Sequence, residues 1–514
     1  MIIAFADIAT CYSPVGGLNF TAACEAARNE TFHQRPDWAM NTQFRCGAKY
    51  DSQTNASLSI NSTLEWCRSN YGGWQRSTPS QWASTLIGFL LPSLVFITTI
   101  PTFPALAKIP RDTYGAFIHP FVIFFASIMV VFALLGPILA GAIYELIFDW
   151  QLMKLLKELR VEDKRRAITL ILLGSYRWNR DDDPSRQALL SLPSFREVLG
   201  FTSAPETNLP TKLVQIYNGK SANQVKAAKK DLHLLMKAQH SFGKDIGVPI
   251  IIFIVSLGYA LWDAGSRRGD SDTAFSIAFG LWYSTIAVTA IGTNCIIGAE
   301  PVVVEYLFGS NFQVARIWER KEWILECFSG NRISTQDVGV LKEKLFASNK
   351  MTIRFFGTGS VLLIATLQCI LAIVVCYHTP SVGFGCRSVT VLVYLLSQSV
   401  QTVAWSLPDA RWSSFKTFVY WICGTISCCS SLAGTLLQLL GVYRKCVCRA
   451  GLIYLTRKGG AVEFATDTKE ARDKAWISIM AGVLGLVILL LVVCAGHYYR
   501  VNMRRECKKE ITGL

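Results

Sequence analysis

Apolar residues in this chain are gathered into eight long runs that contain no Asp, Glu, Lys or Arg. Each run holds roughly 17 or more residues, enough for an α-helix to cross ~30 Å of hydrocarbon. Helices satisfy their own backbone hydrogen bonds in lipid, so we predict an all-α integral membrane protein, a polytopic bundle of about eight transmembrane helices. The predicted spans are 83–107, 115–143, 247–262, 274–298, 355–377, 388–407, 417–442 and 475–497.

Polar segments between these runs divide the chain into parts. Amphipathic patterns at 151–166 and 226–240 predict helices inside the longest loop, and the loop at 299–354 also has helical character. The predicted parts are a small N-terminal ectodomain (1–82), a first transmembrane pair (83–143), a basic helical loop (144–246), a second pair (247–298), a helical loop (299–354), three helices (355–442), a basic loop (443–474), a last transmembrane helix (475–498) and a basic tail (499–514).

Charge supports the membrane assignment. Of 514 residues, 51% are apolar and only 17% are charged, which is too little charge for the surface of a soluble protein of this length. The formal net charge of +15 lies in loops beside the apolar runs, where anionic lipid headgroups attract Lys and Arg. We therefore expect the lipid bilayer as the partner of these charges, and no nucleic acid.

The number of spans is left open by the charges near the C-terminus. An external N-terminus followed by eight spans would place the C-terminus outside, yet the tail at 499–514 is basic, which favours the cytoplasm. Seven spans and one re-entrant or interfacial segment would resolve this conflict. The Pro-rich first run or the short third run is the expected exception.

The N-terminal 82 residues carry the signs of a lumenal or external segment. Six Asn lie there and four are in N-x-S/T sequons, whereas none of the nine later Asn is in a sequon. Four Cys in the same segment could form two disulfides in an oxidising compartment, by any of three pairings. The predicted glycosylation sites are Asn19, Asn29, Asn55 and Asn61, and the disulfide candidates are Cys11, Cys24, Cys46 and Cys67. We expect a multi-pass glycoprotein of the plasma membrane or of a secretory-pathway endomembrane.

A few uncharged polar side chains fall within or beside the predicted spans: Gln368, Gln398, Gln401, Gln438 and Asn294. They have two readings. They could line an intramembrane path for a neutral solute, or they could hydrogen-bond across helices, which is the commoner use of such groups. Ion-driven transport finds no support, because the spans contain no ionisable Asp, Glu, Lys or Arg.

Two short motifs resemble uncharacterised multi-pass membrane proteins of filamentous fungi. One is the G-x-G-C-R-S junction from Gly383 to Ser388, and the other is the Cys-containing start from Cys11 to Gly17. The resemblance implies a membrane protein with an external Cys-containing N-terminus and implies no activity. Cys386 in the junction is either a disulfide partner or a free thiol, and Cys448 is expected to be a reduced structural thiol.

The remaining residues contain no complete catalytic or cofactor motif. The acidic run from Asp181 to Asp183 has no second acidic motif to complete a metal–diphosphate site, and the His residues form no HxxxH or HExxH pattern. No cofactor or metal is predicted, and the protein is expected not to be an enzyme. The leading hypothesis is a receptor-like, scaffold or cell-surface protein. The alternatives are a carrier for a neutral or lipophilic metabolite and a membrane-embedded enzyme acting on a lipophilic substrate.

Overall fold

The structure is a computed structural model, and the residues that it describes make up the helices, four strands and a few adjoining positions. They are 59–63, 86–100, 111–155, 164, 168, 171–172, 176–178, 222–239, 242–266, 271–296, 312–314, 350–378, 384–407, 413–440, 442–444, 448, 461–465 and 469–513.

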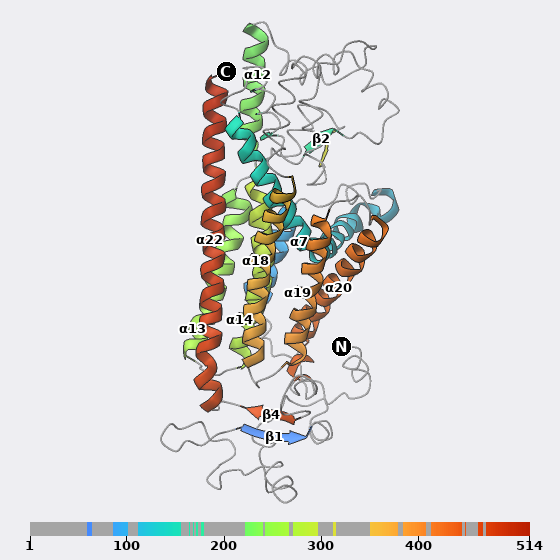
Figure 1. The fold of residues 1–514 in the computed structure, drawn as a ribbon, viewed down its shortest axis with the longest axis vertical. Coiled ribbons are helices and arrows are strands. Elements are labelled where there is room, and N and C mark those ends of the chain that lie inside the picture. Colours follow the sequence, from blue (N-terminus) through green and yellow to red (C-terminus); the bar gives the residue numbers. More distant parts are fainter. Residues whose placement is uncertain are drawn as a thin grey trace, which may run out of the picture.

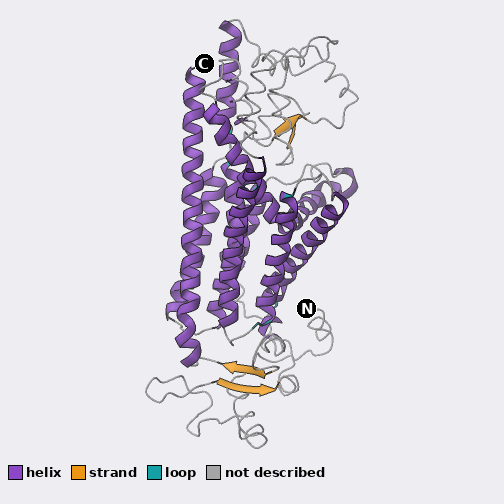
Figure 2. Ribbon diagram, in the orientation of Figure 1, coloured by secondary structure: helices purple, strands orange, loops and turns teal. Residues whose placement is uncertain are grey.

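The protein is an all-α polytopic membrane protein, as predicted, and each of the eight apolar runs coincides with a helix (Figures 1 and 2). Six helices are long and apolar enough to cross a membrane. Of the other two, the first is short and α19 is more polar. The bundle consists of η2 (Leu86–Leu90) continuing into α5 (Leu91–Thr99), α7 (Arg111–Leu155), α13 (Val248–Ser266), α14 (Ser271–Cys295), α18 (Lys350–His378), α19 (Cys386–Ser406), α20 (Ser413–Leu439) and α22 (Lys469–Gly513).

Helix α14 is the centre of the bundle. It packs against α5, α7, α13, α18 and α22, and almost all of its most apolar stretch is buried. Four of its buried polar residues are Ser and Thr whose hydroxyl hydrogens are donated to backbone carbonyls three or four residues earlier in the same helix, so these hydrogens need no outside partner. These residues are Ser284, Thr285, Thr289 and Thr293.

The bundle has two distinct ends. At one end, the short strands β1 (Ser59–Thr63) and β4 (Ala461–Ala465) pair antiparallel, with Ser59 opposite Ala465, below the helices in Figure 1. We call this the β1–β4 end. The opposite end holds α12 (Ala222–Lys237), a second strand pair of β2 (Tyr176–Trp178) with β3 (Phe312–Val314), and the C-terminus, and we call it the tail end. Helix α12 confirms the helix expected at 226–240.

Helix α7 has both of its ends toward the tail end. Its C-terminal half reaches α22 there, where the Tyr499 hydroxyl donates to the Leu146 carbonyl at 2.8 Å. Its N-terminus follows α5, whose Thr99 is hydrogen-bonded by Asn294 at the tail end of α14. Figure 1 shows α7 bent, with its first turns level with the tail-end halves of α19 and α20.

This course of α7 favours seven crossings, the second of the two counts that the sequence allowed. By length and composition the second run is one of the six helices able to cross, whereas the first is the shorter helix Leu86–Thr99, so the expectation that the first or third run is the exception stays a prediction. Seven crossings place the β1–β4 end and the C-terminus on opposite sides of the bilayer, which agrees with the basic tail.

Candidate functional site

Gln398 on α19 occupies the break that Pro137 makes in α7. Because proline has no N–H, the Ala133 carbonyl loses its helical donor, and the displaced backbone also opens the turn at Gly136. The Gln398 amide satisfies these groups: its Oε1 accepts from the Gly136 N–H at 2.8 Å, and its Nε2 donates to the Phe132 and Ala133 carbonyls at 3.0 and 3.3 Å. The side chain therefore replaces part of the backbone ladder of a neighbouring helix.

Close packing at this break depends on Gly136. A Cβ placed there would collide with the Thr402 hydroxyl of α19 and lie 3.0 Å from the Gln398 Oε1. Thr402 itself donates to the Gln398 carbonyl at 2.7 Å and is buried. The sequence therefore supplies a glycine, a proline and a glutamine that fit one another across two helices.

Gln401, one turn further along α19, joins α20 in a similar way. Its Nε2 donates to the Tyr420 carbonyl at 3.1 Å, and it lies against Gly424, where a Cβ would be 2.8 Å from that nitrogen. Its Oε1 is buried and has no hydrogen-bond partner among the described residues.

The other three candidate residues lie apart from this pair. Gln368 of α18 donates to the Gly485 carbonyl of α22 at 3.1 Å, and its buried Oε1 also lacks a described partner. Asn294 donates to the Ala290 carbonyl at 2.9 Å near the tail end, and Gln438 is half-buried near the C-terminus of α20. The structure thus brings Gln398 and Gln401 together on α19 and leaves the others at separate contacts.

An aromatic and hydroxyl cluster fills the bundle between α14, α19 and α20. Tyr283 stacks on Phe279 with ring centroids 4.3 Å apart, and Trp282 meets both Tyr283 and Tyr394 edge to face at 5.7 and 5.6 Å. The Tyr283 hydroxyl shares a 2.5 Å hydrogen bond with Thr435 of α20. All of these side chains are buried, and the offset and edge-to-face geometries are those that aromatic rings prefer.

A disulfide joins Cys386, at the start of α19, to Cys448, 62 residues later. This corrects the expectation that Cys448 is a reduced thiol and settles Cys386 as a disulfide partner. Sequence reasoning missed the pair because nothing local links two cysteines that are brought together only by the α19–α20 hairpin. Gly385 permits the approach, since a Cβ there would lie 2.8 Å from the Cys448 carbonyl oxygen.

Tyr443, in the short helix η4 (Val442–Arg444) after α20, reinforces this junction. Its hydroxyl donates to the Thr390 hydroxyl of α19 at 3.0 Å. Burial raises the pKa of Tyr443 to about 12, so the hydroxyl stays protonated at neutral pH and keeps donating. The disulfide and this hydrogen bond together fasten the β1–β4 ends of α19 and α20.

Helix α22 runs as one continuous element from the β1–β4 end to the tail end (Figure 1). It begins four residues after β4, and its 45 residues correspond to ~67 Å of helix. Three glycines on its inner side, Gly482, Gly485 and Gly496, press against α13 and α14, where any Cβ would overlap a side chain of those helices. Small residues let transmembrane backbones approach closely in this way.

Past the bilayer, α22 stays packed on one side. Met503, Cys507 and Ile511 are buried at a four-residue spacing. The Arg500 guanidinium, also buried, donates to the Asn294 carbonyl at 2.6 Å, where a cation complements the C-terminal dipole of α14.

Two polar contacts then connect α22 to other tail-end segments. The Lys229 ammonium of α12 donates to the Thr512 carbonyl at 2.9 Å, and Lys164 pairs with Glu510 at 3.5 Å. From the sequence we predicted only a basic tail at 499–514. The four-residue spacing of Met503, Cys507 and Ile511 is nevertheless the pattern of one buried helix face.

The predicted glycosylation sites and N-terminal disulfide candidates belong to residues 1–82, which precede the bundle in the sequence. Asn61 lies in β1; the other three sequon asparagines and all four candidate cysteines lie outside the described residues. Across the part of the chain that the structure describes, no group of three or more His, Cys, Asp and Glu side chains is placed to share a metal ion.

Comparisons with known proteins give no relative: no family model, no curated protein and no solved structure matches this chain.

Proposed function

We propose that the protein is a non-enzymatic, receptor-like membrane protein in which helix α22 links an external head to a tail-end helical assembly. In this proposal the head contains residues 1–82 together with strand β4, and it faces the exterior or the secretory lumen. The tail-end assembly contains α12 and the end of α22 and faces the cytoplasm. The membrane is the plasma membrane or a secretory-pathway endomembrane.

The observation that carries the proposal is the continuity of α22. One helix begins four residues after a strand of the head, crosses the bilayer and ends in contact with Lys164 and Lys229 of the tail end. A displacement or rotation of α22 at its β1–β4 end would be transmitted along a single helix to the tail end. Receptors and scaffolds need this kind of mechanical connection, and neither a carrier nor an enzyme requires it.

The orientation has independent support in the sequence. All four sequons lie on the head, and N-glycans are added in the secretory lumen. The Cys386–Cys448 disulfide lies at the β1–β4 end and is the kind of bond that persists in an oxidising compartment. The basic residues from Arg500 to Lys509 lie at the other end, where the cytoplasmic leaflet favours them.

A carrier for a neutral solute is the second candidate, and one observation favours it. The Oε1 atoms of Gln368 and Gln401 are buried without described partners, and a solute with hydrogen-bond donors could satisfy them. The amide nitrogens of both residues, and both ends of Gln398, are nevertheless occupied by helix backbones. We therefore rank this function below the receptor-like one.

Hydrogen exchange at the tail end tests the proposal. An antibody fragment raised against residues 1–82 would be bound to the reconstituted protein, and exchange would be followed in α12 and in residues 503–511. We expect binding at the head to change exchange in both segments severalfold. A single Ala inserted after Val501 rotates the following residues by ~100° and should abolish the response.

The matched control is a single Ala inserted after Gly513, beyond the last buried residue Ile511, which should leave the response intact. Unchanged exchange in the wild-type protein with the fragment bound would contradict the coupling. Uptake of a neutral solute by liposomes, lost on Gln401→Leu, would instead support the carrier.

A further inference from the structure

Helix α22 has an outward stripe that changes from apolar to basic without changing direction. Within the bilayer the stripe is exposed and apolar, with Leu491 64% and Tyr498 70% exposed. Continuing at helical spacing past Val501, the next exposed residues on the same side are cationic. The stripe consists of Leu484, Val487, Leu491, Cys494, Tyr498, Val501, Arg504, Arg505 and Lys508.

Aromatic residues fix the depth of these cations. Trp476 and Tyr498 are 62% and 70% exposed and lie 22 residues apart, or ~33 Å along the helix, close to the thickness of the hydrocarbon core. Exposed Trp and Tyr gather at the two membrane interfaces. Arg504 and Arg505 follow Tyr498 by six and seven residues, or ~10 Å, which places them at the level of the lipid headgroups.

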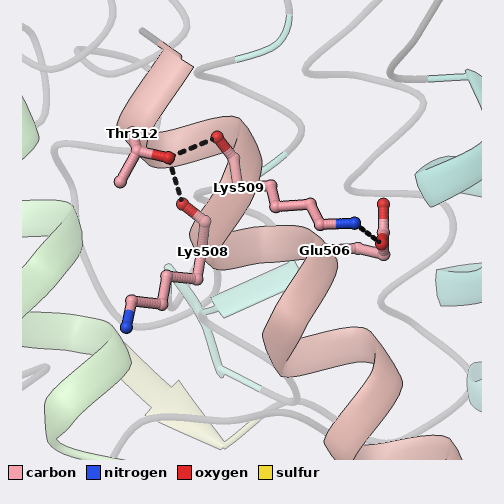
Figure 3. Close-up of polar contacts among 4 residues, drawn as sticks. All are labelled: Glu506, Lys508, Lys509 and Thr512. Carbon is pink, nitrogen blue, oxygen red and sulfur yellow. Dashed lines mark hydrogen bonds and ion pairs between the residues drawn. The ribbon is translucent and has the colours of Figure 1, made fainter.

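The acidic side chains at the end of α22 are already paired with other lysines. Lys509 pairs with Glu506 at 2.9 Å, and Glu510 pairs with Lys164. Figure 3 shows the Lys508 ammonium directed away from the Glu506–Lys509 pair. Within the described part of the chain, the side chains of Arg504, Arg505 and Lys508 have no hydrogen-bond or ion-pair partner.

We propose that Arg504, Arg505 and Lys508 form a binding surface for an anionic phospholipid headgroup of the tail-end leaflet. The acyl chains of that lipid would lie along the apolar part of the stripe, and its phosphate and carboxylate would meet the three cations. Arg suits this role because its planar guanidinium binds phosphate through two parallel hydrogen bonds. The proposal needs only that α22 crosses the bilayer, and it is independent of the coupling proposed above.

The test compares two variants with the same change of charge. R504Q/R505Q/K508Q removes the three unpaired cations, whereas K164Q/K229Q/K509Q removes three tail-end cations that already have protein partners. Each protein would be reconstituted in phosphatidylcholine nanodiscs containing a minority of phosphatidylserine. Native mass spectrometry would then give the ratio of the two lipids retained per protein.

We expect the wild-type protein and the control variant to be enriched in phosphatidylserine to within a factor of two of each other. A cation near the membrane surface changes the partition of an anionic lipid by about fivefold, so the first variant should lose about tenfold or more of that enrichment. Thermal unfolding measured by circular dichroism should be the same for the wild type and for R504Q/R505Q/K508Q, since the three side chains removed have no partner among the described residues.

Three results would overturn the proposal. The first is no enrichment in the wild-type protein, and the second is an equal loss in both variants, which would show only the effect of net charge. The third is displacement of the lipid by millimolar inorganic phosphate, which would identify a site for soluble anions instead.

Discussion

The two sides of the bundle are held together by different means. On the α22 side, contacts with α13 and α14 are made through Gly482, Gly485 and Gly496, and the helices touch through apolar side chains. On the α19–α20 side, Gln398 joins α19 to α7, Gln401 joins α19 to α20, Tyr283 and Thr435 join α14 to α20, and a disulfide fastens the junction. Both sides use glycines for close approach and single hydrogen bonds to backbone carbonyls, such as Gln368 to Gly485 and Arg500 to Asn294 on the α22 side, but only the second adds a buried hydroxyl network and a disulfide.

This difference shows how a membrane protein obtains specificity without a hydrophobic driving force between helices. Lipid is as apolar as the side chains, so helices associate through close packing or through polar contacts. Close packing lets α22 serve as a straight column with one face to lipid. Directional bonds allow α7, which is interrupted by Pro137, to be held in one bent form.

Added bulk at Gly485 should have the largest effect. A Cβ at this position collides with Leu281 of α14 and lies 2.9 Å from the Gln368 Oε1, so Gly485→Val cannot be accommodated without separating the helices. We expect a loss of about 3 kcal/mol or more in the free energy of unfolding, measured by thermal unfolding in detergent.

The control is Ala495→Val, which adds similar bulk to an exposed position of the same helix. Its unfolding temperature should match that of the wild type. Equal stability of the two variants would show that α22 does not pack through its glycines.

Removal of the disulfide should weaken the α19–α20 side. Cys386→Ser with Cys448→Ser releases a loop of 62 residues, for which we expect a loss of about 2–3 kcal/mol. This loss of stability is at the low end of the range for disulfides, because helices persist in the unfolded state within a bilayer and leave less chain entropy to restrict. Peptide mapping without reduction should recover the two cysteines in one linked peptide pair. Recovery of both as free thiols would contradict the structure at this end.

Gln398→Leu should cost about 2 kcal/mol, because three interhelical hydrogen bonds are lost and the groups freed by Pro137 stay unsatisfied. Gln438→Leu is the matched control. The Gln438 side chain is half-buried and has no hydrogen bond within the described residues, so this variant should lose almost none of the free energy of unfolding. The prediction fails if the two variants unfold at the same temperature.

Tyr283→Phe should have the smallest effect. It removes the 2.5 Å hydrogen bond to Thr435 and keeps the stacked ring. Interhelical hydrogen bonds in membranes average ~0.6 kcal/mol, so we expect a shift of about that size. The double variant with Thr435→Val, analysed as a thermodynamic cycle, isolates the bond. A coupling energy near zero would show that the ring, and not the hydroxyl, makes the contact.

The eight helices could be predicted because a run without ionic side chains has one physical explanation in a chain of this composition. The role of Gln398 could not be predicted, because its partners are backbone groups made available by Pro137, 261 residues earlier. The sequence left Gln398 with two readings, and only the position of α7 against α19 shows which atoms it meets.

The disulfide and the course of α7 could not be predicted from the sequence for a similar reason: both depend on how distant segments pack. Cys448 was one of sixteen cysteines, and its pairing with Cys386 depends on the hairpin between α19 and α20. The charge of the tail indicated that one apolar run fails to cross, but charge alone does not reveal the bend of α7. The contact of Tyr499 with Leu146 places the C-terminal half of α7 toward the tail end, and Figure 1 shows the bend.

The proposed connection through α22 requires that the head and the tail lie on opposite sides of the membrane. Protease protection of sealed microsomes tests this directly, with an epitope tag after Leu514 and endoglycosidase treatment to report the head. We predict that added protease removes the tag while a glycosidase-sensitive fragment containing residues 1–82 stays protected. A tag protected together with the glycosylated head would show an even number of crossings and would contradict the account.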